Sequence, residues 1–353
     1  MRPAPTFNGS HLLIWPRSRG SGAREGGGQW RGEAVDRAGP CASRPTPSNA
    51  LLLYVRCMVL GAVELAGRVV EYAEWGDPAG FPVLVMHGTP GSRRGRWSDA
   101  AALAATGARQ IGMNRPGYGG STRLVGRTVA DVVPDVLAVA DALGVGRFAI
   151  SGTSGGGPHA LAVAALAPDR VVRCRVTSSV APFGIAGFFD GMDPHNVEEW
   201  ELVAAGRGLP EVTRRVALMR DRVRDDPASI YNDLALPASD QASLGEQAAF
   251  AVRRESLSEA LLTPHGWYDD DVAFTKDWGF DLALVRAPVE LRYGRHDVFV
   301  PPRHGDWLAA ALPHAEVTLW QDRGHLGDAT VLDELRALVS ASRQAMADQP
   351  PSP

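Results

Sequence analysis

A serine framed by glycines is the residue of this sequence that is best placed to do chemistry. Gly152-Thr153-Ser154-Gly155-Gly156 follows the short apolar run Phe148-Ala149-Ile150-Ser151 and precedes a helix-forming segment that begins at Pro158. A sharp turn from strand to helix exposes a serine at its apex, and glycines beside it avoid a collision of Cβ atoms across the turn. The helix N-terminus also favours a developing negative charge. We therefore expect Ser154 to be a nucleophile; a glycine-rich turn without chemistry is the alternative.

A serine nucleophile needs a base, and the base needs an acid that orients it. Asp297 stands just past the strand-like run Val289 to Tyr293, and His325 lies in the loop after the last such run, Ala315 to Trp320. The carboxyl ends of parallel strands share one edge of a sheet. Ser154, Asp297 and His325 can therefore meet at that edge as nucleophile, orienting acid and base.

Other titratable residues compete for these roles. His87 opens a turn and is expected to brace it by hydrogen bonds, whereas His159 lies in the helix after the serine and is too near in sequence to reach back. Asp322 precedes His325 by three residues and is the reserve candidate for the acid, since Asp297 could be an ordinary turn residue. The histidines expected at the surface are His296, His304 and His314.

A second turn with chemical potential is Met86-His87-Gly88-Thr89-Pro90-Gly91-Ser92, directly after the apolar run Pro82 to Met86. A backbone N–H of this turn can pair with that of Gly155 to hold an oxyanion. In a known case, the loss of one such donor costs about 3–4 kcal/mol of transition-state stabilisation. The alternative is that this segment is only a turn.

Short apolar runs alternate with helical segments from Met58 onward. This alternation predicts an α/β fold with a mostly parallel central sheet and helices on both faces, in which the strands that begin at Met58 and Val69 form a hairpin. Residues 58–181 and 282–348 are expected to form this core. Residues 182–281 contain helical stretches without a convincing strand and are expected to form a helical lid.

The expected lid carries aromatic side chains, some of which are expected to line an apolar acyl pocket. They are Phe183, Phe188, Phe189, Trp200, Tyr231, Phe250, Trp267 and Tyr268. The acidic run Asp269-Asp270-Asp271 is expected to be a solvated turn.

The first 57 residues differ from the rest of the chain. They are rich in Gly, Pro and Ser, and they hold eight Arg against three acidic residues. Such a segment buries too little apolar surface to offset its ordering entropy, so we expect a disordered N-terminal extension. Met58 is expected to be the true start of the protein, and a functional basic tail is the competing hypothesis.

The composition suits a globular protein and excludes several partners. The 353 residues are 45% hydrophobic, and their formal net charge of −4 gives no basic surplus of the kind that binds nucleic acid. The sequence also implies no cofactor and no metal. No apolar run approaches the ~18 residues that a membrane span needs. Cys41, Cys57 and Cys174 share no metal-ligand spacing and are expected to be reduced thiols of a cytoplasmic protein.

With these motifs identified, the chain from Met58 to Met346 resembles the lidded serine hydrolases of the α/β-hydrolase fold superfamily. Gly152 to Gly156 is similar to its nucleophile elbow, and Ser, Asp and His follow each other in the order of that family. His87 to Gly91 is similar to its oxyanion loop, which implies the backbone N–H groups of Thr89 and Gly155 as donors. A loop of this family that usually begins with Asp resembles the segment that starts at Asn114, which reads Asn-Arg-Pro-Gly-Tyr-Gly-Gly-Ser.

The resemblance implies a serine hydrolase that forms an acyl-enzyme on a small ester or related acyl substrate. It leaves open a C–C bond hydrolase, an aminopeptidase, a cofactor-free haloperoxidase and a non-catalytic ligand receptor of the same fold. Epoxide hydrolases and dehalogenases are disfavoured, because they carry Asp where Ser154 stands. The expected partner is a small acyl substrate, without nucleic acid or membrane.

Overall fold

The computed structural model describes residues 58–95, 100–232, 234–244, 247–312, 314–326 and 331–348. The predictions for residues 1–57, namely disorder and a true start at Met58, lie outside these ranges, as do Cys41 and Cys57. Cys174 is buried and carries a free thiol.

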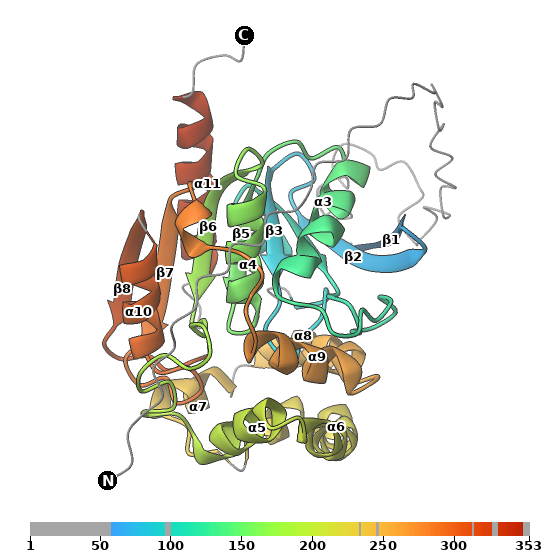
Figure 1. Ribbon diagram of the computed structural model, residues 1–353. Coiled ribbons are helices and arrows are strands. Elements are labelled where there is room, and N and C mark those ends of the chain that lie inside the picture. Colours follow the sequence, from blue (N-terminus) through green and yellow to red (C-terminus); the bar gives the residue numbers. More distant parts are fainter. Residues whose placement is uncertain are drawn as a thin grey trace, which may run out of the picture. The chain divides into compact units, whose positions relative to one another are not determined.

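Eight strands form one sheet in the order β1-β2-β4-β3-β5-β6-β7-β8 (Figure 1). β1 and β2 form an antiparallel hairpin and β2 runs antiparallel to β4, whereas all the other neighbouring strands are parallel. The strands are β1 (Val59–Leu65), β2 (Arg68–Gly76), β3 (Phe81–Met86), β4 (Ala108–Met113), β5 (Phe148–Thr153), β6 (Val171–Thr177), β7 (Val289–Gly294) and β8 (Ala315–Trp320). The loops that follow the parallel strands therefore meet at one edge.

Helices pack on both faces of this sheet, because successive side chains of a strand point to opposite faces. Leu84 and Ile150 join a core with α3, α4 and α10 on one face, whereas Val83 and Ala149 join a core with α2 and α11 on the other. The flanking helices are α2 (Ala100–Ala104), α3 (Val133–Ala142), α4 (Gly156–Leu166), α10 (Arg303–Ala311) and α11 (Val331–Ala347), with 3-10 helices η1 (Ala130–Val132) and η3 (Leu282–Leu284). The prediction of a mostly parallel sheet with helices on both faces is confirmed.

Residues 182–281, here called the helical insertion, lie between β6 and β7 in the chain. Figure 1 shows its helices gathered at one end of the sheet. They are α5 (Pro194–Ala204), α6 (Gly208–Asp225), η2 (Pro227–Tyr231), α7 (Ala238–Leu244), α8 (Gln247–Ala260) and α9 (His265–Phe274). Val212, Val216, Leu257 and Trp267 belong to a small core of its own. Asp193 caps α5 by accepting the N–H of His195.

Two expectations about polar residues were wrong. Asp269, Asp270 and Asp271 do not form a solvated turn but lie in α9 and are buried, since arginines pair with Asp269 and Asp270. His304 is buried rather than at the surface. Its Nδ1 accepts the N–H of Ala181 and its Nε2 lies 2.9 Å from the carbonyl oxygen of Phe188, so both ring nitrogens are satisfied inside the fold.

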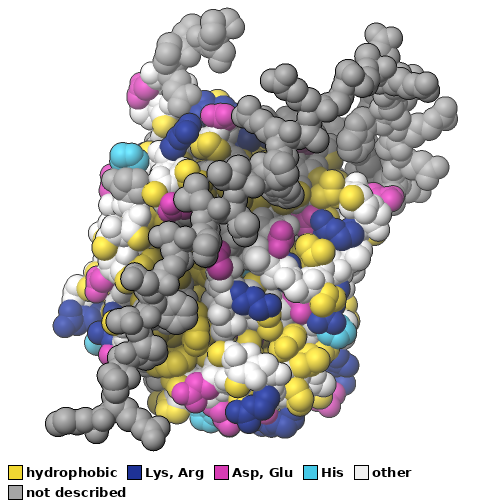
Figure 2. Space-filling model, viewed as in Figure 1, with side chains coloured by type: hydrophobic (Ala, Val, Ile, Leu, Met, Phe, Trp, Pro, Cys, Tyr) yellow, Lys and Arg dark blue, Asp and Glu magenta, His cyan; other side chains and the backbone are white. Residues whose placement is uncertain are grey.

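The surface in Figure 2 carries acidic and basic side chains interspersed with hydrophobic ones. Within the described ranges, no helix combines the length and the apolar character required to cross a membrane.

Candidate active site

Ser154 occupies the apex of a strained turn between β5 and α4. Its φ of 54° lies in the left-handed region, which costs a residue with a side chain about 1–2 kcal/mol. A Cβ atom on Gly152 would lie 2.3 Å from the carbonyl oxygen of Gly156, and one on Gly156 would lie 2.1 Å from that of Met86. Both neighbouring glycines are therefore required by the backbone, as the spacing of the motif predicts.

His325 and Asp297 are hydrogen-bonded to each other. Nδ1 of His325 lies 2.8 Å from Oδ2 of Asp297, which is 3% exposed. The other oxygen, Oδ1, accepts the backbone N–H groups of Phe299 at 2.9 Å and Val300 at 2.8 Å. Burial alone would lower the pKa of His325, but the charge and hydrogen bond of Asp297 raise it above its ordinary value. Nε2 is the ring nitrogen left for a second partner.

Ser154 and His325 line the same cavity, which has a volume of about 510 Å³. Gly88, Thr89 and Gly155 line it as well. The structure thus brings four sequence-predicted residues to one cavity, with Asp297 bonded to the imidazole. The reserve acid, Asp322, is exposed.

The two loops proposed to supply oxyanion donors are in contact. A Cβ atom on Gly155 would lie 2.2 Å from Oγ1 of Thr89, and one on Gly88 would lie 3.6 Å from Cβ of Ser154. Glycine at position 155 therefore allows the side chain of Thr89 to pack directly against the turn that carries the serine.

Sequence reasoning missed Asp240, a buried residue of α7 that holds the loop of His325. Its Oδ2 accepts the backbone N–H of His325 at 2.9 Å, and its Oδ1 accepts that of Leu326 at 3.1 Å. Burial raises the pKa of the Asp240 carboxyl, although the two backbone donors oppose this shift. A Cβ atom on Gly324 would lie 2.4 Å from Oδ2 of Asp240. No motif marks this contact, because it joins positions 85 residues apart.

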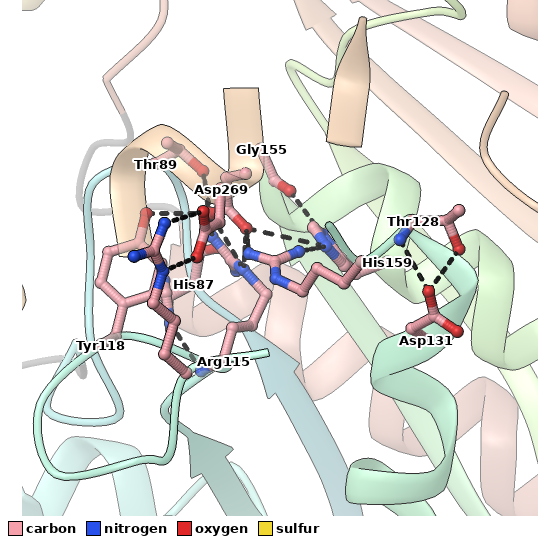
Figure 3. Close-up of polar contacts among 12 residues, drawn as sticks. His87, Thr89, Arg115, Tyr118, Thr128, Asp131, Gly155, His159 and Asp269 are labelled. Carbon is pink, nitrogen blue, oxygen red and sulfur yellow. Dashed lines mark hydrogen bonds and ion pairs between the residues drawn. The ribbon is translucent and has the colours of Figure 1, made fainter. Parts of the chain in front are cut away.

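A buried charge network lies against the loop of Thr89 (Figure 3). Asp270 of α9 forms ion pairs with Arg115 and Arg127, and it accepts the hydroxyl hydrogens of Thr89 at 2.7 Å and Tyr118 at 2.9 Å. Burial alone would raise the pKa of Asp270, but the positive charges of Arg115 and Arg127 hold it well below its usual range. Asp270 is therefore ionised, and sequence reasoning missed it too.

Two histidines beside this network are neutral. Burial, together with the nearby charge of Arg115, lowers the pKa of His87 well below its ordinary value and that of His159 to about 3. Nδ1 of His87 lies 2.7 Å from the carbonyl oxygen of Gly88, which confirms the prediction that His87 braces its turn.

A pair of carboxyl groups from the helical insertion also borders the cavity. Glu199 accepts Nε1–H of Trp267 at 2.7 Å and Nη1–H of Arg215 at 2.6 Å. Burial, and then the negative charge of Glu199, raise the pKa of Asp271 well above its usual range. The protonated form of Asp271 is therefore favoured over its ordinary range.

Three of the predicted pocket aromatics, Trp200, Tyr231 and Trp267, line the cavity. Phe183, Phe188 and Phe189 do not line it: Phe183 and Phe188 pack against Trp200, and Phe189 packs against these two phenylalanines. Among the described residues, no group of three or more His, Cys, Asp or Glu side chains is arranged to hold a metal ion.

Asn114 has partners that explain why it replaces the usual aspartate. Its Oδ1 accepts the backbone N–H of Arg93 at 2.7 Å, and its Nδ2 donates to Oε2 of Glu71 at 2.9 Å. An aspartate at this position would place a carboxylate against the carboxylate of Glu71, whereas the amide supplies a donor.

Comparison with known proteins shows what this chain is similar to. A sequence profile described as alpha/beta hydrolase fold matches residues 82–327. The chain is 27% identical to a dihydrolipoyllysine-residue acetyltransferase component of an acetoin cleaving system from Pseudomonas putida, covering 74% of this chain but only 63% of that protein. It is 26% identical to a proline iminopeptidase from Neisseria meningitidis, covering 75% and 90% of the two chains. It is also 26% identical to a pimeloyl-[acyl-carrier protein] methyl ester esterase from Nitrosomonas europaea, covering 70% and 89%.

Solved structures share the fold at lower sequence identity. A bromoperoxidase from Bacillus anthracis superposes with a TM-score of 0.58 at 20% identity, covering 83% of this chain and all of that chain. An enol-lactonase from Burkholderia xenovorans gives a TM-score of 0.56 at 19% identity, covering 82% and 100%.

Proposed function

This chain belongs to the alpha/beta hydrolase fold family, and we propose that it is a serine hydrolase acting on a small ester or related acyl substrate. Ser154 is the nucleophile, His325 the base and Asp297 the residue that orients the base. The observation that carries this proposal is the 2.8 Å hydrogen bond from His325 to Asp297. The imidazole of His325 lines the same cavity as Ser154, whose φ is 54°.

In the first half of the reaction, Nε2 of His325 takes the hydroxyl proton of Ser154 while Oγ attacks the acyl carbonyl carbon. The carbonyl oxygen becomes an oxyanion, which the backbone N–H groups of Thr89 and Gly155 stabilise. Asp297 stabilises the imidazolium that forms. When the tetrahedral intermediate collapses, the bond to the leaving group breaks and His325 returns the proton to the departing oxygen.

In the second half, water attacks the acyl-enzyme. His325 takes a proton from the water as its oxygen bonds to the acyl carbon, and the same backbone donors stabilise the second oxyanion. Collapse releases the acid, and the proton returns to Oγ of Ser154. Throughout the reaction, the helical insertion serves as a lid that supplies Trp200, Tyr231 and Trp267 to the acyl pocket.

A small acyl substrate suits the size of the cavity, and the similarity to a methyl ester esterase supports an ester. An aminopeptidase is the second candidate, because proline iminopeptidases are relatives and the carboxyl groups of Glu199 and Asp271 line the cavity. Arg215 weighs against it, since this guanidinium already neutralises Glu199.

A panel of p-nitrophenyl esters with acyl chains of increasing length, beside amino-acid p-nitroanilides, tests both candidates. The wild-type protein should hydrolyse a short ester, and Ser154→Ala should lose this activity. Equal turnover by the two proteins would refute the nucleophile, and a higher kcat/KM for an anilide would favour the aminopeptidase. A fluorophosphonate probe should label the wild type but not Ser154→Ala, and His325→Ala should be labelled far more slowly.

A further inference from the structure

We propose that Asp270 of the helical insertion is a positioning residue for the oxyanion loop, residues 87–91, and that it acts through Arg115 and Thr89. This inference rests on the proposed function, because it concerns the N–H group of Thr89 as an oxyanion donor. The direction of the Thr89 N–H group would then be set by the side chain of Asp270, which belongs to the helical insertion.

The first step in the argument is the orientation of the peptide unit between Gly88 and Thr89. Nη2 of Arg115 donates to the carbonyl oxygen of Gly88 at 3.1 Å, and Nη1 of Arg115 donates to that of His87. The C=O and N–H of a trans peptide unit point in opposite directions. The N–H of Thr89 is therefore directed away from Arg115, and Thr89 itself stands in the wall of the cavity that contains Ser154.

The second step is the anchoring of Thr89 by its own side chain. Its hydroxyl donates to Oδ2 of Asp270 at 2.7 Å and accepts from Nη2 of Arg115 at 3.0 Å. The same side chain packs against Gly155, the other proposed donor. The two donors are thus fixed relative to each other by a threonine whose hydroxyl is held by Asp270 and Arg115.

The third step is the dependence of Arg115 on Asp270. Nε of Arg115 lies 3.1 Å from both carboxylate oxygens of Asp270, and both side chains are fully buried. A buried guanidinium that loses its counter-charge is strongly destabilised, and its geometry changes with it. Removal of the carboxylate therefore disturbs the contacts that Arg115 and the Thr89 hydroxyl make, and leaves the peptide unit with the contact between Nδ1 of His87 and the carbonyl oxygen of Gly88.

Positioning and electrostatics predict opposite effects here. Asp270 is opposed by two guanidinium groups, those of Arg115 and Arg127, and its neutralisation would increase the positive charge behind the oxyanion loop. If charge alone mattered, Asp270→Asn would stabilise the oxyanion and raise kcat. A positioning role predicts a lower kcat.

The chain offers a matched control in Asp269, the preceding residue of α9. Asp269 is also buried and forms a two-pronged ion pair with Arg123, with distances of 2.7 and 2.8 Å. This ion pair attaches the same helix to the core without a contact to the oxyanion loop. Asp269→Asn therefore weakens the attachment of α9 but leaves the anchoring of Thr89 intact.

The experiment compares kcat and KM for p-nitrophenyl acetate in Asp270→Asn, Asp269→Asn, Thr89→Val and Thr89→Ser. Asp270→Asn and Thr89→Val should each lower kcat about tenfold or more while KM changes by less than about threefold, because misplacement costs the transition state more than the bound substrate. Asp269→Asn should stay within about twofold of wild type in kcat. Thr89→Ser keeps the hydroxyl and should lose less than Thr89→Val.

The combined variant Thr89→Val/Asp270→Asn tests whether the two residues act together. The fold-loss in its kcat should be smaller than the product of the two single fold-losses, because both changes remove the same contact. The inference is overturned if the losses multiply, if only KM changes, or if Asp270→Asn behaves as Asp269→Asn does. If Asp270→Asn does not fold, the Thr89→Val and Thr89→Ser pair decides, because neither changes a charge.

Ser154→Ala separates this inference from the function on which it rests. Full activity of Ser154→Ala would overturn the proposed function and the inference with it. An inactive Ser154→Ala together with an unchanged kcat in Thr89→Val would overturn the inference alone.

Discussion

Oδ2 of Asp297 contacts Nδ1 of His325 at 2.8 Å, while Oδ1 of the same carboxylate is held by the backbone N–H groups of Phe299 and Val300. The two positions therefore make different demands: the position of Oδ1 needs an acceptor for two backbone N–H groups, and that of Oδ2 faces the imidazole. This asymmetry determines what an amide at this position would do.

In Asp297→Asn, the amide oxygen should stay with the two backbone donors, and the NH₂ group should face His325. An NH₂ group donates to Nδ1 and so forces the imidazole proton onto Nε2, the nitrogen that accepts the proton of Ser154 in the proposed mechanism. We expect kcat to fall about 10³- to 10⁴-fold. Steady-state kinetics with p-nitrophenyl acetate checks this, with thermal unfolding as the control for folding. A variant with nearly unchanged kcat would exclude Asp297 as the orienting acid.

The pH dependence of activity should report the environment of His325. The base works only when it is neutral, and Asp297 raises its pKa above the ordinary value. Activity should therefore be lost on acidification at a pH above about 6.5, the unperturbed pKa of histidine. A profile of kcat/KM from acidic to mildly alkaline pH measures this limb. A limb centred below that value would contradict the hydrogen-bonded arrangement.

Asp240→Ala should loosen the loop that carries the base. The substitution leaves the backbone N–H groups of His325 and Leu326 without their acceptor, at a cost of about 1–3 kcal/mol in unfolding free energy. The imidazole should also be less well placed, so we expect slower labelling by a fluorophosphonate probe. Gly324→Ala should act in the same direction, because its Cβ would collide with the Asp240 carboxylate. Unchanged stability and labelling in both variants would argue against this role.

Asp271→Asn should change how stability varies with pH. The raised pKa of Asp271, caused first by burial and then by the charge of Glu199, means that the folded state favours the protonated form. Its stabilising contribution is complete below the unfolded pKa of about 3.9 and is lost as pH rises through the folded pKa. Asn cannot ionise, so the variant should gain stability relative to wild type as pH rises over that window.

Urea unfolding at acidic and at alkaline pH measures this difference. The neighbouring charged groups are Glu199, Asp270 and Arg215, and none of them is altered. Asp221→Asn, at an exposed position of α6, serves as the control and should show no such trend. A stability difference that is the same at both pH values would contradict the prediction.

The elements could be predicted from the sequence, and the three principal site residues could be proposed from it, because local signals mark them. The glycines around Ser154 follow from backbone geometry, and apolar runs locate the strand ends that precede Asp297 and His325. The sheet with helices on both faces is confirmed, and the structure brings the three residues to the same edge. Their roles stay a prediction until variants are measured.

The buried acidic residues of the helical insertion had no such signal. Asp270 stands in a run of three aspartates, a composition typical of solvated turns, and its partners Arg115 and Arg127 are 155 and 143 residues away. Asp240 contacts backbone N–H groups, and because almost every residue type carries such a group, the sequence does not mark the partners. Burial of a charge depends on a distant partner, and one sequence read alone does not pair them.

Asp240 and Asp270 both belong to the segment between β6 and β7, yet each reaches across to a loop of the sheet. An attempt to change selectivity by grafting the corresponding segment of another hydrolase would therefore disturb the proposed reaction centre together with the proposed acyl pocket. A graft that retains Asp240 and Asp270 would alter the pocket and still leave both loops supported, because Gly324 leaves room for Asp240 and Arg115 pairs with Asp270.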